Sequence, residues 1–235
     1  MNRRLFIASA GAALMMPKAY ASIFQSSFKV INAGVGGNNT IDLLNRMETD
    51  CLSHKPKLVF LMIGTNDMNS MKHVPLERYR ANLVKLADAI LASGSQLVLM
   101  SILPFYEPYL FTRHPREFYG AEGPSGRRAA VNRTIEEVAK SKHALFFDIG
   151  RIIETIGKIG PQRDSLLTNT ENGKSEDGVH PTPDGYRLMG ALVYQFLCDH
   201  KLPKEQIVCF GDSITKGDGS IDRESYPAYL AKLLD

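Results

Sequence analysis

The sequence predicts an α/β fold, a three-layer α/β/α sandwich around a mainly parallel five-stranded sheet. Short apolar runs of strand length alternate with segments of helical period, which is typical of βαβ units around a parallel sheet. The apolar runs are also nearly continuous, as expected of strands whose two faces are both covered by helices. Because the sequence has no internal repeat and no linker segment, residues 22–235 are interpreted as one domain.

The predicted elements follow one another in regular alternation. The predicted strands are Lys29–Asn32, Leu58–Ile63, Gln96–Ile102, Ala144–Asp148 and Ile207–Phe210. The predicted helices cover about 40–50, 75–93, 125–142 and 183–200, with a last helix from Tyr226 to Leu234. The helix at 183–200 has clear ends, because Thr182 is a favourable N-cap, Pro183 fits the first helical position and Pro203 lies beyond the end.

Two stretches, Phe105–Gly126 and Ile152–Glu176, fit neither strand nor helix and are expected to be irregular. The first follows a predicted strand, and loops at the carboxyl ends of parallel strands form the binding crevice of such sheets. We therefore expect its aromatic residues Phe105, Tyr106 and Tyr109 to contact the substrate. The alternative is a surface loop whose rings only pack down on the domain.

Composition and charge exclude several classes of protein. A chain of 235 residues with 44% hydrophobic and 23% charged residues is not collagen-like, not low-complexity and not a small disulfide scaffold. Beyond residue 21, basic and acidic residues balance, so the charge gives no indication of nucleic-acid binding. Cys51, Cys198 and Cys209 lack the spacing of metal ligands, and their sequence leaves open whether Cys198 and Cys209 pair.

Residues 1–21 are interpreted as an export signal. Arg3-Arg4 is followed by an apolar run, Leu5–Met16, and then by Ala19-Tyr20-Ala21, which fits cleavage after Ala21. The run is too short to span a bilayer, so no stable membrane span is expected. The alternative is a buried amphipathic first helix, and the arginine pair leaves open a twin-arginine rather than a general export route.

The first candidate for chemistry is Gly211-Asp212-Ser213, directly after the last predicted strand. A glycine there permits a sharp turn and leaves the serine at the carboxyl edge of the sheet. If a helical turn starts at this point, its N–H groups favour negative charge near the hydroxyl. Alone, the tripeptide is more typical of an ordinary turn.

The second candidate is Asp177-Gly178-Val179-His180-Pro181, just before the helix at 183–200. An acid three residues before a histidine can hydrogen-bond Nδ1–H and leave Nε2 free as a base. The alternative is an exposed histidine in a loop that leads into a helix. No histidine pair in the sequence has the spacing of a metal site.

Two further motifs supply hydrogen-bond donors at strand ends. Gly64-Thr65-Asn66-Asp67 follows one predicted strand, and a glycine-rich segment, residues 32–38, follows another. An asparagine amide and a glycine N–H are suitable donors to an oxyanion. The glycine-rich segment lacks G-x-G-x-x-G spacing, so nucleotide binding is not expected.

Together the four motifs resemble those of the SGNH, or GDSL-like, hydrolase superfamily, over nearly all of residues 27–235. The resemblance implies a flavodoxin-like sandwich and a serine esterase without metal or organic cofactor. It implies Ser213 as nucleophile, His180 as base and Asp177 as its orienting acid. The oxyanion hole would consist of the N–H groups of Ser213 and Gly37 and the side-chain amide of Asn66.

The chain departs from the family in the order of its motifs. The serine block comes first in the family and last here, whereas reading residues 206–235 before Phe28 restores the usual order. The sequence therefore resembles a circular permutation of the family fold. Geometry, and not chain order, defines a triad, so activity is expected to survive the rearrangement.

The resemblance implies an exported serine ester hydrolase that acts on a small-molecule or glycan ester. Export and the aromatic stretch favour a carbohydrate O-acetyl esterase. A lysophospholipase-like or thioesterase-like acyl hydrolase is the alternative, and an acyltransferase or a non-catalytic glycan-binding module are alternatives of another class. Acyl length, alcohol and oligomeric state are left open.

Overall fold

The computed structural model describes residues 28–220 and 224–235, so the leader predicted at residues 1–21 lies outside the described residues. Five strands form one sheet in the order β1-β5-β2-β3-β4, and every neighbouring pair is parallel. The strands are β1 (Val30–Gly34), β2 (Leu58–Met62), β3 (Gln96–Met100), β4 (Leu145–Phe147) and β5 (Ile207–Gly211). The predicted α/β class is confirmed, and the strand ends differ from the predicted ones by one or two residues.

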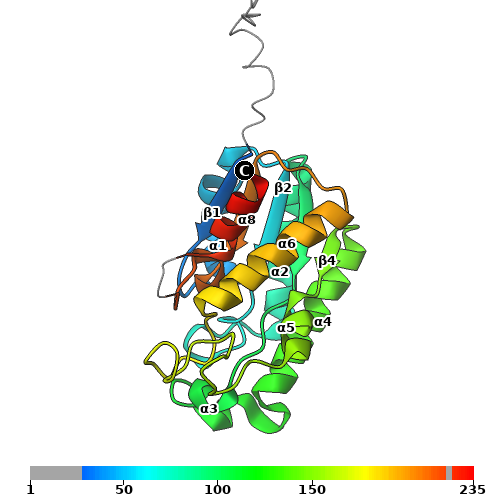
Figure 1. The fold of residues 1–235 in the computed structure, drawn as a ribbon. Helices are drawn as coiled ribbons and strands as arrows, with labels where there is room; N and C mark the ends of the chain where they lie inside the picture. The colour runs from blue at the N-terminus through cyan, green and yellow to red at the C-terminus, as the bar shows by residue number, and fades with distance from the viewer. Residues whose placement is uncertain (1–27, 221–223) are drawn as a thin grey trace, which may run out of the picture.

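Helices cover both faces of the sheet, which gives three layers (Figure 1). Helices α1, α2 and α4 pack on one face, and α5, α6 and α8 pack on the other. The longer helices are α1 (Thr40–Asp50), α2 (Leu76–Ala92), α4 (Gly123–Ser141), α5 (Ile149–Ile156), α6 (Pro183–Asp199) and α8 (Tyr226–Leu234). The short ones are α3 (Glu107–Leu110), α7 (Ser213–Lys216) and the 3₁₀ turns η2 (Leu52–His54), η3 (Ser70–Lys72) and η4 (Arg116–Glu122).

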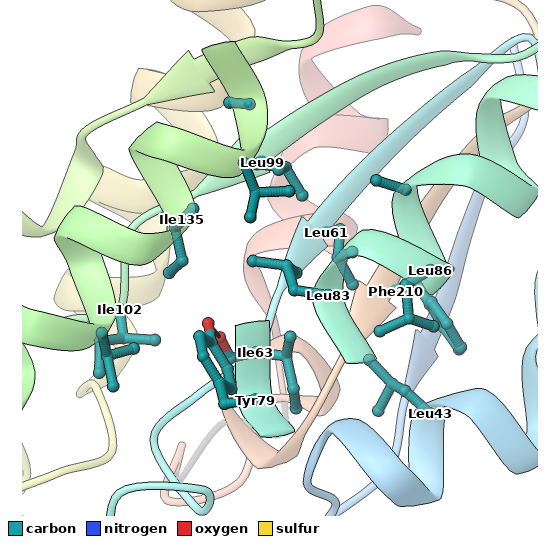
Figure 2. Close-up of a cluster of buried hydrophobic side chains, with 14 of the residues drawn as sticks. Leu43, Leu61, Ile63, Tyr79, Leu83, Leu86, Leu99, Ile102, Ile135 and Phe210 are labelled. Carbon is teal, nitrogen blue, oxygen red and sulfur yellow. Dashed lines mark hydrogen bonds between the residues drawn. The ribbon is translucent and has the colours of Figure 1, made fainter. Parts of the chain in front are cut away.

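The two hydrophobic cores follow from the alternation of side chains along each strand. In β2, Val59 and Leu61 face the core under α1, α2 and α4, whereas Leu58 and Phe60 face the opposite core. Figure 2 shows part of the first core, where residues of β2, β3 and β5 meet those of three helices. The labelled side chains are Leu43, Leu61, Ile63, Tyr79, Leu83, Leu86, Leu99, Ile102, Ile135 and Phe210.

The last strand in the chain lies inside the sheet. β5 pairs with β1 on one side and with β2 on the other, and all five of its residues are buried. β5 is therefore an interior strand of the sheet, although it is the last of the five strands in the chain. The permutation itself stays a prediction.

Local sequence sets the helix ends. Thr182 caps α6, as predicted, because its hydroxyl accepts from the N–H of Gly185 at 3.2 Å. Asn39 forms a capping box with Asp42 at the start of α1. These caps satisfy N–H groups that have no partner within their own helix.

Both stretches expected to be irregular contain helical turns. The second begins inside α5, a short helix that is capped by the Asp148 side chain and ended by Gly157 in the left-handed conformation. The first holds α3, η4 and the first turn of α4. The expectation was wrong for α3 and η4 because helical turns of four to seven residues give almost no periodic signal. It was wrong for α5 although Ile149, Ile152, Ile153 and Ile156 have helical spacing, because the predicted irregular stretch begins at Ile152 and divides this pattern.

Three smaller points complete the fold. Cys51, Cys198 and Cys209 are free thiols, so Cys198 and Cys209 do not pair. Within residues 28–220 and 224–235, no helix has the length and apolar character needed to cross a membrane. Gly211 ends β5 at a point where a Cβ would lie 2.3 Å from Thr215 Oγ1 and 2.4 Å from the Met62 carbonyl oxygen, so only glycine fits.

Candidate active site

The four motifs meet at the carboxyl edge of the sheet. Gly34, Gly211 and Met62 end three neighbouring strands in register, so the segments that follow them start side by side. The loop that precedes α6 arrives at the same edge and brings His180 to Ser213. The motifs are far apart in the sequence, and the parallel sheet brings them together because its strands end at the same edge.

Ser213 is the first residue of α7, in the turn that directly follows β5. Asp212 caps this turn, because its Oδ1 accepts from the N–H of Ile214 at 3.0 Å. The turn is short, and it leaves Ser213 partly exposed at the carboxyl edge of the sheet. A hydroxyl held in this way is accessible to a substrate and to a base.

Ser213, His180 and Asp177 form a continuous chain of hydrogen bonds. Ser213 Oγ lies 2.9 Å from His180 Nε2, and His180 Nδ1 lies 2.8 Å from Asp177 Oδ2. Asp177 contains no proton to donate when ionised, so Nδ1 carries the hydrogen and Nε2 is left as the acceptor. In this tautomer the imidazole can take the serine proton.

Asp177 is held as a carboxylate. Burial alone would raise its pKa, but the hydrogen bond and charge of His180 and the N–H groups of His180 and Val179 lower the pKa to about 2. Those two N–H groups donate to Oδ1 at 2.7 and 2.9 Å. The loop thus fixes the carboxylate on one oxygen and presents the other to the imidazole.

The proposed oxyanion donors lie on two neighbouring loops. Asn66 Nδ2 donates to the carbonyl oxygen of Asn38 at 2.8 Å, which places Asn66 beside the segment that carries Gly37. An amide has two N–H donors, so one remains for another acceptor. Gly37 has φ +74° and open space where a Cβ would stand. The two predicted donors are therefore brought together.

The predicted substrate residues lie against residues 177–181, the loop that carries His180 and is called the base loop below. The N–H of Tyr106 donates to the Gly178 carbonyl at 2.8 Å, and Tyr109 packs edge-on against Tyr106. Phe105 differs from the expectation that it contacts the substrate, since it is 9% exposed and belongs to the hydrophobic core.

Three residues near the site were not found from the sequence. Arg113 donates to the Asp177 carbonyl at 2.7 Å, Gly219 lies against His180, and Arg46 spans two strand ends. Each acts through contacts between distant parts of the chain, and no local motif marks such contacts. Of the three, only Gly219 could have been noticed in the sequence, because it is a glycine in a turn.

Two buried acids, Asp212 and Asp67, lie in the loops that follow β5 and β2. Burial raises the pKa of Asp212 to about 7 and that of Asp67 to about 6. Asp67 accepts from the Thr40 N–H and hydroxyl, which ties the loop after β2 to the start of α1.

A cavity of about 260 Å³ lies beside Asp67 between α2 and α4, and neither Ser213 nor His180 lines it. Across the described residues, no group of three or more His, Cys, Asp and Glu side chains is placed to hold a metal ion.

The sequence model of the GDSL-like Lipase/Acylhydrolase family matches residues 9–188, which is more than half of the chain. The chain belongs to this family. The match contains the segments of Gly37, Asn66, Asp177 and His180, and it ends before Ser213. Like other members of the GDSL-like family, the protein is a serine carboxylic ester hydrolase.

Two curated relatives match about two thirds of the chain or more. An uncharacterized lipoprotein, YqeF, of Bacillus subtilis (strain 168) is 28% identical over 178 residues, which are 70% of this chain and 72% of the relative. An acetylxylan esterase of Geobacillus stearothermophilus is 28% identical over 171 residues, 68% of each protein.

Solved structures of the GDSL-like family share the fold. A lipase/acylhydrolase from Enterococcus faecalis has a TM-score of 0.56 at 19% identity, covering 72% of this chain and 75% of that one. The acetyl xylan esterase AlAXEase has a TM-score of 0.55 at 20% identity, covering 70% of this chain and 79% of that one. At these identities the likeness concerns the fold alone.

Proposed function

We propose that the protein hydrolyses its ester through a triad of Ser213, His180 and Asp177. The observation that carries this proposal is the unbroken hydrogen-bond chain Ser213 Oγ to His180 Nε2 and His180 Nδ1 to Asp177. The serine lies at an open sheet edge, where an ester can reach it.

In the first half of the reaction, His180 Nε2 takes the proton of Ser213 as Oγ attacks the ester carbonyl. Asp177 stabilises the imidazolium that forms. The tetrahedral intermediate collapses, the bond to the alcohol oxygen breaks, and His180 returns the proton to the leaving alcohol. An acyl-enzyme on Ser213 remains.

In the second half, water attacks the acyl-enzyme while His180 takes one of its protons, and the acid leaves as Ser213 regains a hydrogen. Both tetrahedral intermediates carry an oxyanion, which would accept from the N–H groups of Ser213 and Gly37 and from the Asn66 amide. Each such donor is worth about 10²–10³ in rate.

We propose a carbohydrate O-acetyl ester as the substrate. The support is the relative named an acetylxylan esterase, whose 28% identity extends over 68% of this chain. Tyr106 and Tyr109 add flat rings beside the base loop, and such rings can stack on sugars.

A substrate series tests the proposal. Hydrolysis of acetyl to lauroyl p-nitrophenyl esters is compared with acetate release from acetylated xylooligosaccharides, with wild-type protein and the Ser213→Ala variant. We expect acetyl esters to be preferred and the variant to lose about 10⁴–10⁶-fold in kcat. A preference for lauroyl ester would favour a lipid acyl hydrolase, and acyl transfer to an added alcohol would favour a transferase.

A fluorophosphonate probe tests the nucleophile separately. It should label the wild type at Ser213 and leave Ser213→Ala unlabelled. Ser101 and Ser125 are the internal controls. Ser101 is fully buried and its hydroxyl accepts from the Gly150 N–H, whereas the Ser125 hydroxyl donates a hydrogen bond to Glu107 Oε1. Labelling at either would contradict the assignment. Asp177→Asn should lower kcat by about 10⁴-fold through the wrong tautomer.

We also propose that the protein is exported after cleavage near Ala21. The support is the charged start, apolar run and Ala-Tyr-Ala site of the sequence, together with a relative named as a lipoprotein. N-terminal sequencing of the exported protein should begin at Ser22. A soluble intracellular product that retains Met1 would contradict export.

A further inference from the structure

Arg46 lies in the middle of α1 and extends its side chain across the carboxyl ends of two strands. Its Nη2 donates to the Gly211 carbonyl at 2.7 Å, and its Nη1 donates to the Ala33 carbonyl at 2.9 Å. Its Nε donates to Asn38 Oδ1 at 2.6 Å. One guanidinium therefore joins the end of β5, the end of β1 and the glycine-rich loop.

Two of these three acceptors lie close in the chain to the proposed reacting groups. Gly211 is two residues before Ser213, and Asn38 directly follows Gly37. The carbonyl of Asn38 also accepts from Asn66 Nδ2 at 2.8 Å. The contacts of Arg46 thus extend to the nucleophile turn on one side and to both loop donors of the oxyanion on the other.

The guanidinium is fixed in its own place. Its side chain is only 14% exposed, and it lies 4.7 Å from the ring centroid of Phe210. Asp50, one turn further along α1, forms an ion pair with Nη1 at 3.1 Å. The three nitrogens point in different directions within one plane, so a lysine ammonium could satisfy only part of this set.

We propose that Arg46 is a positioning residue, which holds the Ser213 turn and the Gly37–Asn66 donors at the separation that the tetrahedral intermediate requires. The proposal rests on the proposed triad mechanism. Arg46 touches no substrate, so it acts on the rate of the chemical step and not on substrate binding. Displacements of about 1 Å at a catalytic group can cost about 10²-fold in rate.

The test measures kcat and KM on p-nitrophenyl acetate for wild type, Arg46→Ala, Arg46→Lys and the control Asp50→Ala, with thermal unfolding of each. Asp50→Ala removes the ion pair with the Asp50 carboxylate, whose side chain is 39% exposed, and leaves the carbonyls of Gly211 and Ala33 and the Asn38 side chain in contact with Arg46. We expect Arg46→Ala and Arg46→Lys to lose about 10- to 100-fold in kcat with unchanged KM. Asp50→Ala should stay within about threefold of wild type.

Two readouts separate positioning from folding. The rate constant for inactivation by a fluorophosphonate should fall in Arg46→Lys in parallel with kcat, because it reports attack by Ser213 alone. Millimolar guanidinium should restore part of the kcat of Arg46→Ala and none of that of Ser213→Ala. If Arg46→Ala does not fold, Arg46→Lys, which keeps the charge and the Asp50 pair, carries the test.

The proposal is overturned if Arg46→Lys keeps wild-type kcat, or if its loss appears in KM. It is also overturned if kcat falls only in proportion to the unfolded fraction. Failure of the triad mechanism looks different, because Ser213→Ala would then keep its activity whatever the Arg46 variants do.

Discussion

Gly219 lies directly against His180. A Cβ at Gly219 would stand 2.5 Å from the Cβ of His180 and 3.3 Å from its Cγ. Gly219 also has φ +84°, in the left-handed region that favours glycine. The base of the proposed triad is therefore packed against a residue that has no side chain.

Gly219→Ala is expected to displace His180 and lower kcat by about 10²-fold, because a shift of about 1 Å disturbs proton transfer. Gly94→Ala is the matched control, since Gly94 has φ +82° and nothing within 4 Å of an added Cβ. Both variants meet the same backbone strain, which costs about 1–2 kcal/mol. Thermal unfolding should show a loss of stability in both variants, larger in Gly219→Ala because of the added contact with His180, whereas kinetics on p-nitrophenyl acetate should show a loss of activity in Gly219→Ala only. Equal kcat in the two variants would contradict the prediction.

The loop of Tyr106, Tyr109 and Arg113 allows a second prediction. Arg113→Ala removes the hydrogen bond to the Asp177 carbonyl and should lower kcat by about 2–10-fold on every ester, the value of one hydrogen bond. Tyr109→Ala should change the ratio of rates on bulky and acetyl esters more than the rate on acetyl ester itself. The measurement is kcat/KM across the ester series. An equal loss on all esters in Tyr109→Ala would show that Tyr109 acts through the base loop, as Arg113 does.

Stability should depend on pH through Asp212. Burial raises its pKa to about 7 from the value of 3.8 in the unfolded chain, and the nearby Asp67 carboxylate raises it as well. The folded state therefore binds more protons between about pH 4 and pH 7, and its stability falls as the pH rises through this range. No described residue donates a hydrogen bond to Asp212 Oδ2, so ionisation is not compensated there.

The midpoint of thermal unfolding is expected to fall from pH 5 to pH 8 by about 2–4 °C for each kcal/mol lost. Asp212→Asn keeps the cap on the Ile214 N–H and should flatten this decline. Part of it remains through Asp67, whose pKa burial raises to about 6. Asp177 acts in the opposite sense, because its pKa of about 2 makes stability fall only in strong acid. A midpoint that is constant from pH 5 to pH 8 would contradict the prediction.

The predicted permutation can be tested by moving residues 206–235 to a position just before Phe28, with Lys201 as the new C-terminus. Phe28 and Leu234 pack in the same hydrophobic core, and the C-terminus lies at the end of the molecule where β1 begins (Figure 1). A flexible joint of a few residues should therefore connect Asp235 to Phe28. We expect the rearranged protein to fold and to keep esterase activity, because permutation mainly exchanges surface connections. A folded but inactive protein would contradict the predicted convergence of the motifs.

Much of the fold could be predicted because its signals are local. The strands are continuous apolar runs, and Thr182 and Pro183 mark the start of α6 in the sequence itself. Helix α5 was missed although Ile149, Ile152, Ile153 and Ile156 have helical spacing, because the stretch predicted to be irregular begins at Ile152 and cuts this short pattern in two.

The site could be predicted only as far as its motifs are contiguous. Asp177 and His180 are three residues apart, and their hydrogen bond was expected from that spacing. Arg46 and Gly211 are 165 residues apart, and an arginine in a helix gives no sign of the carbonyl it will contact. Phe105 was placed in the crevice because its ring and its position after a strand do not reveal which way the chain turns.

The position of β5 in the sheet has a consequence for the order in which the chain can fold. β1 and β2 are not hydrogen-bonded to each other, and β5 is the strand between them. During synthesis this strand emerges last, together with the serine two residues beyond it. Until then β1 and β2 lack the strand that pairs with both of them, and the proposed nucleophile has not yet been added. A chain truncated before residue 206 would expose unpaired edges on β1 and β2, and such edges favour aggregation.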